Sequence, residues 1–467
     1  MGSSSPPWPS PLPHAVVLPY PAQGHVIPLM ELSHRLVDHG FSVTFVNTHF
    51  DHARVWASHP GPRAETGPLR LVSIPDGLEP GADRNDLGRL TLALLERMPG
   101  HLEELIRAAS AEPERGPVTC VIADQSMPWA LDVAKKMGLR GVAFWPASAG
   151  LLATMFSIPS LIEDGIINAD GVPTSEHRMI RLCPEMPLMN TAHFVWNCLG
   201  DPITGRIIFD YITRGNKFIE TAEWVLCNSF SHAEFPVFNY APRIRPIGPL
   251  LPGLKPDRLV GRYWPEDSSC MEWLDQQPSN SVVYVAFGSF TIFDPHQFQE
   301  LAIGLEKMGR RFLWVVRPDL TEAANTAFPG GFEERVAERG RMVGWSPQQR
   351  VLAHPSVACF MSHCGWNSTM EGITNGVPFL CWPYFADQFL NESYICDTWK
   401  VGLRLSKDAE GIVTREKIDK TVEALLGDSE VVGRALELKE VVARSIGEGG
   451  SSFDNFNEFV KSMKKVV

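Results

Sequence analysis

Short apolar segments alternate with helical patterns along most of this chain, and this alternation constrains the fold more than any other feature. Candidate strands fall in two series, at residues 14–20, 41–48, 69–74, 118–125, 141–147 and 224–230, and at residues 281–290, 311–317, 357–361 and 377–382. Strands that alternate with helices form parallel sheets with helices on both faces. The sequence therefore predicts an α/β protein with doubly wound, mostly parallel sheets.

The length and the spacing of these series indicate two domains. A chain of 467 residues exceeds one ordinary hydrophobic core. Residues 242–265, between the two series, are rich in Pro, Gly and Arg and show no periodicity. We predict Rossmann-like domains at 1–245 and 266–450, joined by a linker at 246–265. Helical patterns at 87–98 and 101–109 belong to the first domain, and a final one at 455–465, within the C-terminal segment 451–467, is expected to pack back on the first domain.

Composition limits the partners and the compartment. The formal net charge of −12 argues against nucleic acid or an anionic membrane as the main partner. The chain shows no signal-peptide pattern and no apolar run long enough to span a bilayer, so we expect a cytoplasmic protein without membrane insertion. We also expect the protein to be a monomer. Its nine cysteines show no Cys-x-x-Cys or zinc spacing and are expected to be reduced core residues.

Polar residues gather where strands end in the segment 345–388. The strand 357–361 stops at His363, and a helix is predicted to begin near Asn367. Backbone N–H groups at a helix N-terminus bind phosphate well, so this edge fits a nucleotide diphosphate. Ser368 and Glu371 also fit a capping box, which needs no ligand. Cys364 fits packing behind the turn, with a nucleophile or metal ligand as the alternative.

The whole 44-residue segment resembles the signature of the plant secondary-product UDP-glycosyltransferases. That family has the GT-B fold, two Rossmann-like domains that face each other across a cleft. The resemblance implies an enzyme that uses a UDP-sugar, UDP-glucose in particular, and acts on a small-molecule acceptor. It is carried without a gap by Trp345, Pro347, Gln348, Leu352, His354, Phe360, His363, Cys364, Gly365, Asn367, Ser368, Glu371, Gly376, Val377, Pro378, Pro383, Asp387 and Gln388.

The resemblance also implies roles for the donor site. The uracil would stack on Trp345, and the carboxylate of Glu371 would accept hydrogen bonds from the ribose hydroxyls. Gln348 would lie near the uridine, and Trp366 would precede the turn that binds the diphosphate. The diphosphate itself would be held by Ser289, His363, Asn367 and Ser368. The sugar hydroxyls would be held by Asp387 and Gln388, with Thr291 toward the sugar.

His25 is the candidate catalytic base, and Asp124 is its candidate partner. His25 follows the first strand in a Gly-containing turn, and Asp124 closes the strand 118–125. Parallel strands end at the same edge, so the carboxylate can fix the imidazole tautomer and stabilise its charged form. The alternatives are a structural histidine and an aspartate that caps the helix near residue 129. The resemblance implies the same pair as a catalytic dyad.

The same residues predict how the reaction runs. No Asp-x-Asp triplet occurs, so we expect no metal and no other cofactor, with the diphosphate stabilised by helix N-terminal amides and the side chains above. The sequence singles out no carboxylate nucleophile, which favours direct displacement with inversion to a β-glucoside. A Rossmann NAD oxidoreductase is excluded because no Gly-x-Gly-x-x-Gly turn follows a predicted strand.

The acceptor is the least determined element. Residues 150–221 mix aromatic residues with Pro, Gly and Asn, which is typical of specificity loops. We expect transfer to a hydroxyl of a small hydrophobic acceptor, a phenolic or flavonoid first, with N-, S- or C-attack left open. The alternatives are another UDP-sugar, a terpenoid or hormone acceptor, or a non-catalytic UDP-sugar-binding protein. The candidate acceptor contacts are Met127, Phe194, Trp196 and Phe385.

Overall fold

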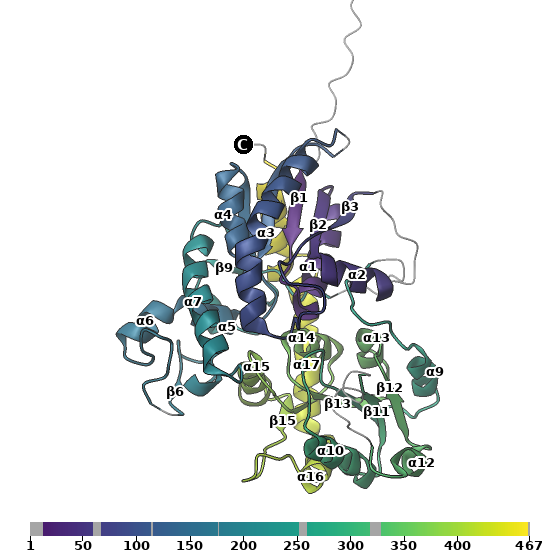
Figure 1. Ribbon diagram of the computed structural model, residues 1–467. Helices are drawn as coiled ribbons and strands as arrows, with labels where there is room; N and C mark the ends of the chain where they lie inside the picture. Colours follow the sequence, from purple (N-terminus) through teal and green to yellow (C-terminus); the bar gives the residue numbers. More distant parts are fainter. Residues whose placement is uncertain are drawn as a thin grey trace, which may run out of the picture.

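A computed structural model describes residues 13–58, 67–113, 115–175, 177–251, 259–317 and 328–465. Figure 1 shows two α/β halves, the first in purple to teal and the second in green to yellow. The Pro/Ser-rich leader and the central part of the predicted linker lie outside the described residues. Two parallel sheets with helices packed on them make the expected GT-B architecture.

The first half is built on a seven-stranded sheet in the order β3-β2-β1-β4-β5-β8-β9. All of its neighbouring strands run parallel. Its central strands are apolar and fully buried, because helices cover both faces. The strands are β1(His14–Leu18), β2(Ser42–Thr48), β3(Leu69–Ile74), β4(Val118–Asp124), β5(Arg140–Trp145), β8(Trp224–Cys227) and β9(Ile244–Pro246).

One helix of this half differs from the sequence prediction. The two helical patterns at 87–98 and 101–109 form a single helix, α3(Leu87–Ser110), with Pro99 inside it. A proline interrupts helical hydrogen bonding, but the apolar stripe of α3, from Leu90 to Ile106, stays buried on both sides of it. The other helices are α1(Gln23–Asp38), α2(His49–Ser58), α4(Trp129–Lys136), α5(Ala149–Phe156), α6(Ile158–Glu163), η1(Thr191–His193), α7(Pro202–Ile219) and α8(Phe235–Tyr240), and a short hairpin joins β6(Met179–Ile180) to β7(Met189–Asn190).

The second half is built on a six-stranded parallel sheet in the order β12-β11-β10-β13-β14-β15. Its strands are β10(Val282–Ala286), β11(Arg311–Val315), β12(Gly340–Val343), β13(Val357–Ser362), β14(Phe379–Cys381) and β15(Gly402–Arg404). Its helices are α9(Ser269–Asp275), α10(Pro295–Lys307), α12(Phe332–Val336), α13(Gln348–Leu352), α14(Trp366–Asn375), α15(Gln388–Ser393), η2(Tyr394–Thr398), α16(Arg415–Gly427) and α17(Ser429–Ile446).

The last helix, α18(Ser451–Met463), returns to the first half (Figure 1). Its apolar side chains Phe459 and Val460 are buried in the same core cluster as Val17 of β1. Arg140 of β5 donates a 2.9 Å hydrogen bond to the carbonyl oxygen of Ser462. The chain thus crosses between the halves twice, once before β10 and once before α18.

Each sheet reverses its strand order at one place. In the first sheet this point lies between β1 and β4, and in the second between β10 and β13. Ligands of open α/β sheets bind at the carboxyl ends of the two strands that flank such a point, because the connections diverge there and leave a crevice. The amide nitrogen Nδ2 of Asn367, which follows β13, donates a 2.8 Å hydrogen bond to the carbonyl oxygen of Gly24, which follows β1. The two crevices therefore face each other.

Candidate active site

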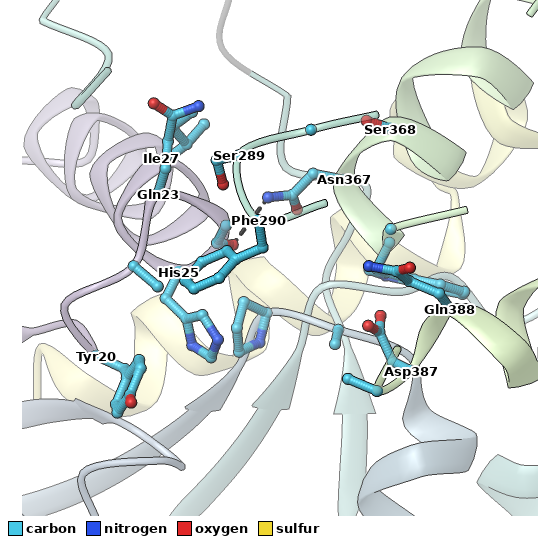
Figure 2. Close-up of a pocket in the computed structure, with 18 of the residues that line it drawn as sticks. Tyr20, Gln23, His25, Ile27, Ser289, Phe290, Asn367, Ser368, Asp387 and Gln388 are labelled. Atoms are coloured by element: carbon cyan, nitrogen blue, oxygen red, sulfur yellow. Dashed lines mark hydrogen bonds between the residues drawn. The ribbon is translucent and has the colours of Figure 1, made fainter. Parts of the chain in front are cut away.

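A single cavity of about 370 Å³ occupies the space between these crevices and is lined by both halves. The first half contributes the turn after β1 and residues of α3, α5 and α7. The second half contributes the segments that follow β10, β12, β13 and β14. Figure 2 shows Tyr20 and His25 on one side of this space, with Asp387 and Gln388 on the other.

His25 lines this cavity and contacts the buried Asp124 behind it, although the two residues are 99 apart in the sequence. Asp124 Oδ2 lies 2.8 Å from His25 Nδ1, and Asp124 Oδ1 accepts a hydrogen bond from the backbone N–H of Ser126. The carboxylate is fully buried, whereas a quarter of the His25 side chain (24%) is exposed to the cavity. His25 lies in the first turn of α1, so this helix begins inside the turn that the sequence predicted. Asp124 does not cap α4, whose N-cap is Pro128, so that alternative is wrong.

Two aromatic side chains fix the orientation of the His25 ring. The Tyr20 ring lies 5.2 Å from it at a tilt, and the Trp145 ring lies 6.4 Å away, edge on. The indole N–H of Trp145 donates to the backbone carbonyl of Ser148, so the indole itself is held in place. With Nδ1 facing a carboxylate, the second ring nitrogen, Nε2, is left as the nitrogen available to a substrate.

Glycines on two neighbouring loops make room for His363. Gly288 follows β10, Gly365 follows β13, and a Cβ atom on either would collide with the imidazole. Gly288 also has a positive φ of 68°, which favours glycine. Burial and the nearby Arg317 lower the pKa of His363 to about 4. The ring is therefore neutral at physiological pH.

Gln348 is the centre of a hydrogen-bond network on the other side of the cavity. Its Nε2 donates to Ser368 Oγ at 2.8 Å and to the carboxylate of Glu371, while its Oε1 accepts from the Tyr284 hydroxyl at 3.0 Å. The N-cap of α14 is Gly365, and Ser368 and Glu371 do not cap that helix, so the capping-box alternative is wrong. Burial raises the pKa of Glu371 to about 7, against the opposing effect of Gln348.

The acidic residue Asp387 and its neighbour Gln388 form the wall opposite His25. Asn391 donates a 2.7 Å hydrogen bond to Asp387 Oδ2. Gln388 Oε1 accepts from the backbone N–H of Tyr384 at 2.7 Å, which holds the turn between β14 and α15. Burial raises the pKa of Asp387, and the nearby imidazole of His25 opposes that shift. The predicted base and the predicted sugar contact thus share one electrostatic environment.

Two residues predicted to contact the UDP-sugar also make hydrogen bonds between the two halves. Trp366 donates its indole N–H to the carbonyl oxygen of Asn228, which follows β8, at 2.7 Å. Asn367 makes the bond to Gly24 described above, drawn as a dashed line in Figure 2. The N-terminal end of α14 is therefore fixed directly to the turn that carries His25.

Four predicted contacts lie away from the cavity wall. Met127, Phe194 and Trp196 belong to the core of the first half and are at most 3% exposed. Trp196 packs on Phe194 and Phe209 and donates its indole N–H to the carbonyl oxygen of Gly171, so these aromatic residues stabilise the loop instead of lining the cavity. Thr291 is 1% exposed and does not line the cavity either.

The other predicted substrate contacts line the cavity, and their roles stay predictions. Phe385 lines the cavity, as do Ser289, Trp345 and Gln348. Cys364 is fully buried, and burial raises the pKa of its thiol, which fits packing and not catalysis. The lining residues that were not predicted include Arg262, Glu266, Tyr284, Gln349, Phe290, Leu87, Thr91, Leu151, Met155, Leu199, Ile208, Tyr211 and Ile212.

In the described ranges no group of three or more His, Cys, Asp and Glu side chains is placed to hold a metal ion. No helix in this part of the chain is long and apolar enough to cross a membrane. Independence from metals stays a prediction.

Known proteins match this chain over its full length. Residues 249–441 match the family model described as UDP-glucoronosyl and UDP-glucosyl transferase. UDP-glycosyltransferase 83A1 of Arabidopsis thaliana is 44% identical, over 97% of each chain. Os79 from O. sativa, solved in complex with UDP, superposes with a TM-score of 0.80 at 29% identity, over 96% of this chain and all of that one. UGT2 of Phytolacca americana, solved with UDP-2fluoro-glucose and pterostilbene, gives 0.79 at 27% identity, over 97% of this chain and all of that one.

These matches agree with the arrangement of the two crevices and extend well beyond the signature segment. The resemblance carried by residues 345–388 is therefore confirmed for the chain as a whole. The protein is an enzyme of the UDP-glycosyltransferase family, with the GT-B fold and close relatives among the plant enzymes that glycosylate small metabolites.

Proposed function

We propose that this protein transfers glucose from UDP-glucose to a hydroxyl group of a small, uncharged, apolar acceptor, with inversion and without a metal. The observation that carries the proposal is the 2.8 Å contact between His25 and the buried Asp124, with His25 lining the same cavity as Trp345 and Asp387. A base that faces a nucleotide-sugar site across a shared cavity supports catalysis over simple UDP-sugar binding.

The proton is taken by His25. Asp124 accepts a hydrogen bond from the Nδ1–H, so His25 Nε2 carries the lone pair and accepts the proton of the acceptor hydroxyl. The oxygen then attacks the anomeric carbon from the face opposite the diphosphate, and the bond from that carbon to the phosphate oxygen breaks. Asp124 stabilises the imidazolium that forms. Displacement from the opposite face gives a β-glucoside from the α-linked donor.

The leaving diphosphate is stabilised by the second half of the molecule. Ser289, Ser368 and the backbone N–H groups that begin α14 line the cavity and present hydrogen-bond donors. The neutral ring of His363, between Gly288 and Gly365, adds a donor without adding a charge. These groups support a reaction that needs no divalent cation.

The uridine and the sugar fit the remaining walls. Trp345 supplies an aromatic face for the base, and Glu371 supplies a carboxylate for the ribose hydroxyls. Asp387 and Gln388 face the base His25 across the cavity and suit the hexose hydroxyls. A glutamine at the latter position supports glucose, and the fluoro-glucose donor bound by the Phytolacca americana enzyme points the same way.

The acceptor wall around His25 is mostly apolar, with Gln23, Thr91, Gln125 and Ser126 as polar exceptions, and its described residues include no Asp, Glu, Lys or Arg side chain. Among the described residues that line the cavity, the charged side chains Arg262, Glu266, Glu371 and Asp387 all come from the linker or the second half. The wall around His25 instead presents the hydrocarbon and aromatic side chains of Tyr20, Ile27, Leu87, Trp145, Leu151, Met155, Val195, Leu199, Ile208, Tyr211, Ile212, Phe290 and Phe385. Such a wall favours a neutral ring system over a carboxylate, whose desolvation it would not offset.

The test is a product screen with UDP-glucose and matched acceptors: a phenol, a terpenoid alcohol, and a carboxylic acid with the same ring skeleton as the phenol. We expect the neutral alcohols to be glucosylated and the acid to be poor. The anomeric coupling constant of the product, measured by NMR, should be that of a β-glucoside. Turnover should survive excess EDTA. An α-glucoside, or complete loss of activity with EDTA, would contradict inversion or metal independence respectively.

A further inference from the structure

Trp345, the aromatic platform of the donor site, is covered by a second tryptophan. The rings of Trp264 and Trp345 are stacked, with centroids 4.9 Å apart and an interplanar angle of 24°. Trp345 lines the cavity, whereas Trp264 does not. Trp264 therefore lies behind Trp345, on the side away from the space where a nucleotide base would stack.

Trp264 belongs to the segment that joins the two halves, and that segment is fixed to the first half. The backbone N–H of Tyr263 donates a 2.9 Å hydrogen bond to Gln23 Oε1 of α1. The hydroxyl of Ser58 donates to the carbonyl oxygen of Arg262 at 2.5 Å. On the other side, the backbone N–H of Asp267 donates to the carbonyl oxygen of Trp345 at 2.8 Å.

A cation from the first half completes the stack. The guanidinium carbon of Arg54, in α2, lies 4.7 Å from the ring centre of Trp264 and 4.3 Å from that of Tyr263. Asp51, one helical turn earlier, lies 3.8 Å from Arg54, and the Thr48 hydroxyl holds that carboxylate in place. A guanidinium over an indole face is attractive and limits the motion of the ring.

From these contacts we propose that Trp264, with Arg54 behind it, is a positioning residue for the nucleotide base. The inference rests on the proposed donor function of the cavity. Arg54, Trp264 and Trp345 form one stack that begins in the first half and ends at the face offered to the base. The half that carries the catalytic base thereby also orients the platform that binds the donor, and Trp264 acts through Trp345 without touching the substrate.

The chain offers a matched control for this stack. Trp224 of β8 lies under Arg245, at 5.9 Å, and packs against Phe459 of α18, at 5.7 Å. It reproduces the chemistry of an arginine on a tryptophan but lines no part of the cavity. A leucine at residue 224 removes as much aromatic surface as a leucine at residue 264.

The experiment measures UDP binding by calorimetry and steady-state kinetics for Trp264→Leu, Trp264→Phe, Arg54→Met and Trp224→Leu. Loss of one aromatic stack corresponds to roughly a 3- to 10-fold change in affinity. We expect Trp264→Leu to raise the UDP Kd and the donor KM by that factor, while kcat and the acceptor KM stay within about twofold. Trp264→Phe should restore most of the affinity, Arg54→Met should show a smaller increase, and Trp224→Leu should bind UDP like the wild type.

The stacked pair also has an optical signature. Two indoles at this distance are expected to give a coupled near-ultraviolet circular dichroism band that disappears in Trp264→Leu and persists in Trp224→Leu. Wild-type UDP affinity in Trp264→Leu, or an equal loss in Trp224→Leu, would overturn the proposal. A loss confined to kcat or to the acceptor KM would overturn it as well. If the unmodified protein bound no UDP, the donor function itself would fail first.

Discussion

The crevices of the two sheets have the same topology but opposite chemistry. In the first sheet, β1 and β4 deliver an imidazole and a carboxylate that touch each other, beside a wall that is otherwise mostly apolar and uncharged. In the second, β10 and β13 deliver glycines, hydroxyl groups and the N-terminus of α14, around an imidazole that stays neutral. The same backbone arrangement thus supports proton transfer on one side and anion binding on the other.

The neighbours of each histidine account for this division. His25 faces the buried carboxylate of Asp124 through Nδ1, which leaves Nε2 as the nitrogen available to a substrate. His363 is buried and has Arg317 nearby, and both lower its pKa and keep it a neutral hydrogen-bonding group. The same residue type is thus the proposed base in one crevice and the proposed anion ligand in the other.

Removal of the base should separate the two crevices most clearly. In His25→Ala we expect kcat for an alcohol acceptor to fall by about 10²- to 10⁴-fold, because no other group takes the hydroxyl proton. The UDP Kd, measured by calorimetry, should stay within about twofold of the wild-type value. Equal losses in kcat and in UDP affinity would show that the division between the crevices does not hold.

Substitution of Asp124, the partner of the base, should also lower kcat, but by less than removal of His25. Asp124→Asn keeps the shape but replaces the acceptor of the Nδ1–H by an amide that can present its own N–H, which favours the unproductive tautomer. We expect kcat to fall on the order of 10²-fold, with donor KM unchanged. A pH–rate profile identical to that of the wild type would argue against this role for Asp124.

A single glycine substitution in the second crevice should weaken UDP binding. Gly288→Ala places a methyl group against His363, so we expect the UDP Kd to rise by about 10- to 100-fold. Gly309→Ala is the control, since Gly309 also has a positive φ, of 62°, but its Cβ would meet nothing within 4 Å. If both variants lost UDP affinity equally, general backbone strain and not the His363 contact would be the cause.

The pKa of Glu371 gives the smallest expected effect. This carboxylate is mostly protonated below its pKa of about 7 and ionised above it, and only the ionised form accepts hydrogen bonds from both ribose hydroxyls. UDP-glucose affinity should therefore weaken by up to about tenfold between pH 8 and pH 6. UDP-glucose is the suitable probe because its diphosphate does not titrate in that range. Glu371→Gln should bind more weakly with a flat pH profile, and a sloping profile in that variant would exclude Glu371 as the source.

Prediction from sequence succeeded where the site depends on local order along the chain. The donor segment is contiguous, so the strand, turn and helix boundaries around His363 and Ser368 could be located from apolar runs and punctuation. The pairing of His25 with Asp124 was also predictable, because each follows a strand of one parallel sheet. The hydrogen bonds of Gln348 could not be predicted, because Ser368 and Glu371, which accept them, also fitted a helix cap in the sequence.

The acceptor wall could not be predicted for the opposite reason. Its residues come from helices α3, α5 and α7, each with one face in the core and one edge at the cavity. Sequence patterns separate buried from exposed faces but do not say which buried residues border an empty space. Phe194 and Trp196 therefore looked like ligand contacts, whereas their rings fill the core against Phe209.

The sequence by itself determined the two parallel sheets, the segment 345–388 and the two residues of the His25–Asp124 pair, because periodicity and strand ends are local properties of a chain. Only the tertiary structure decided which aromatic residues face the cavity and that Trp264 lies behind Trp345. It also decided that Asn367 holds the turn of His25. Those choices depend on how segments hundreds of residues apart pack against one another, and packing is settled by the shape of the whole core.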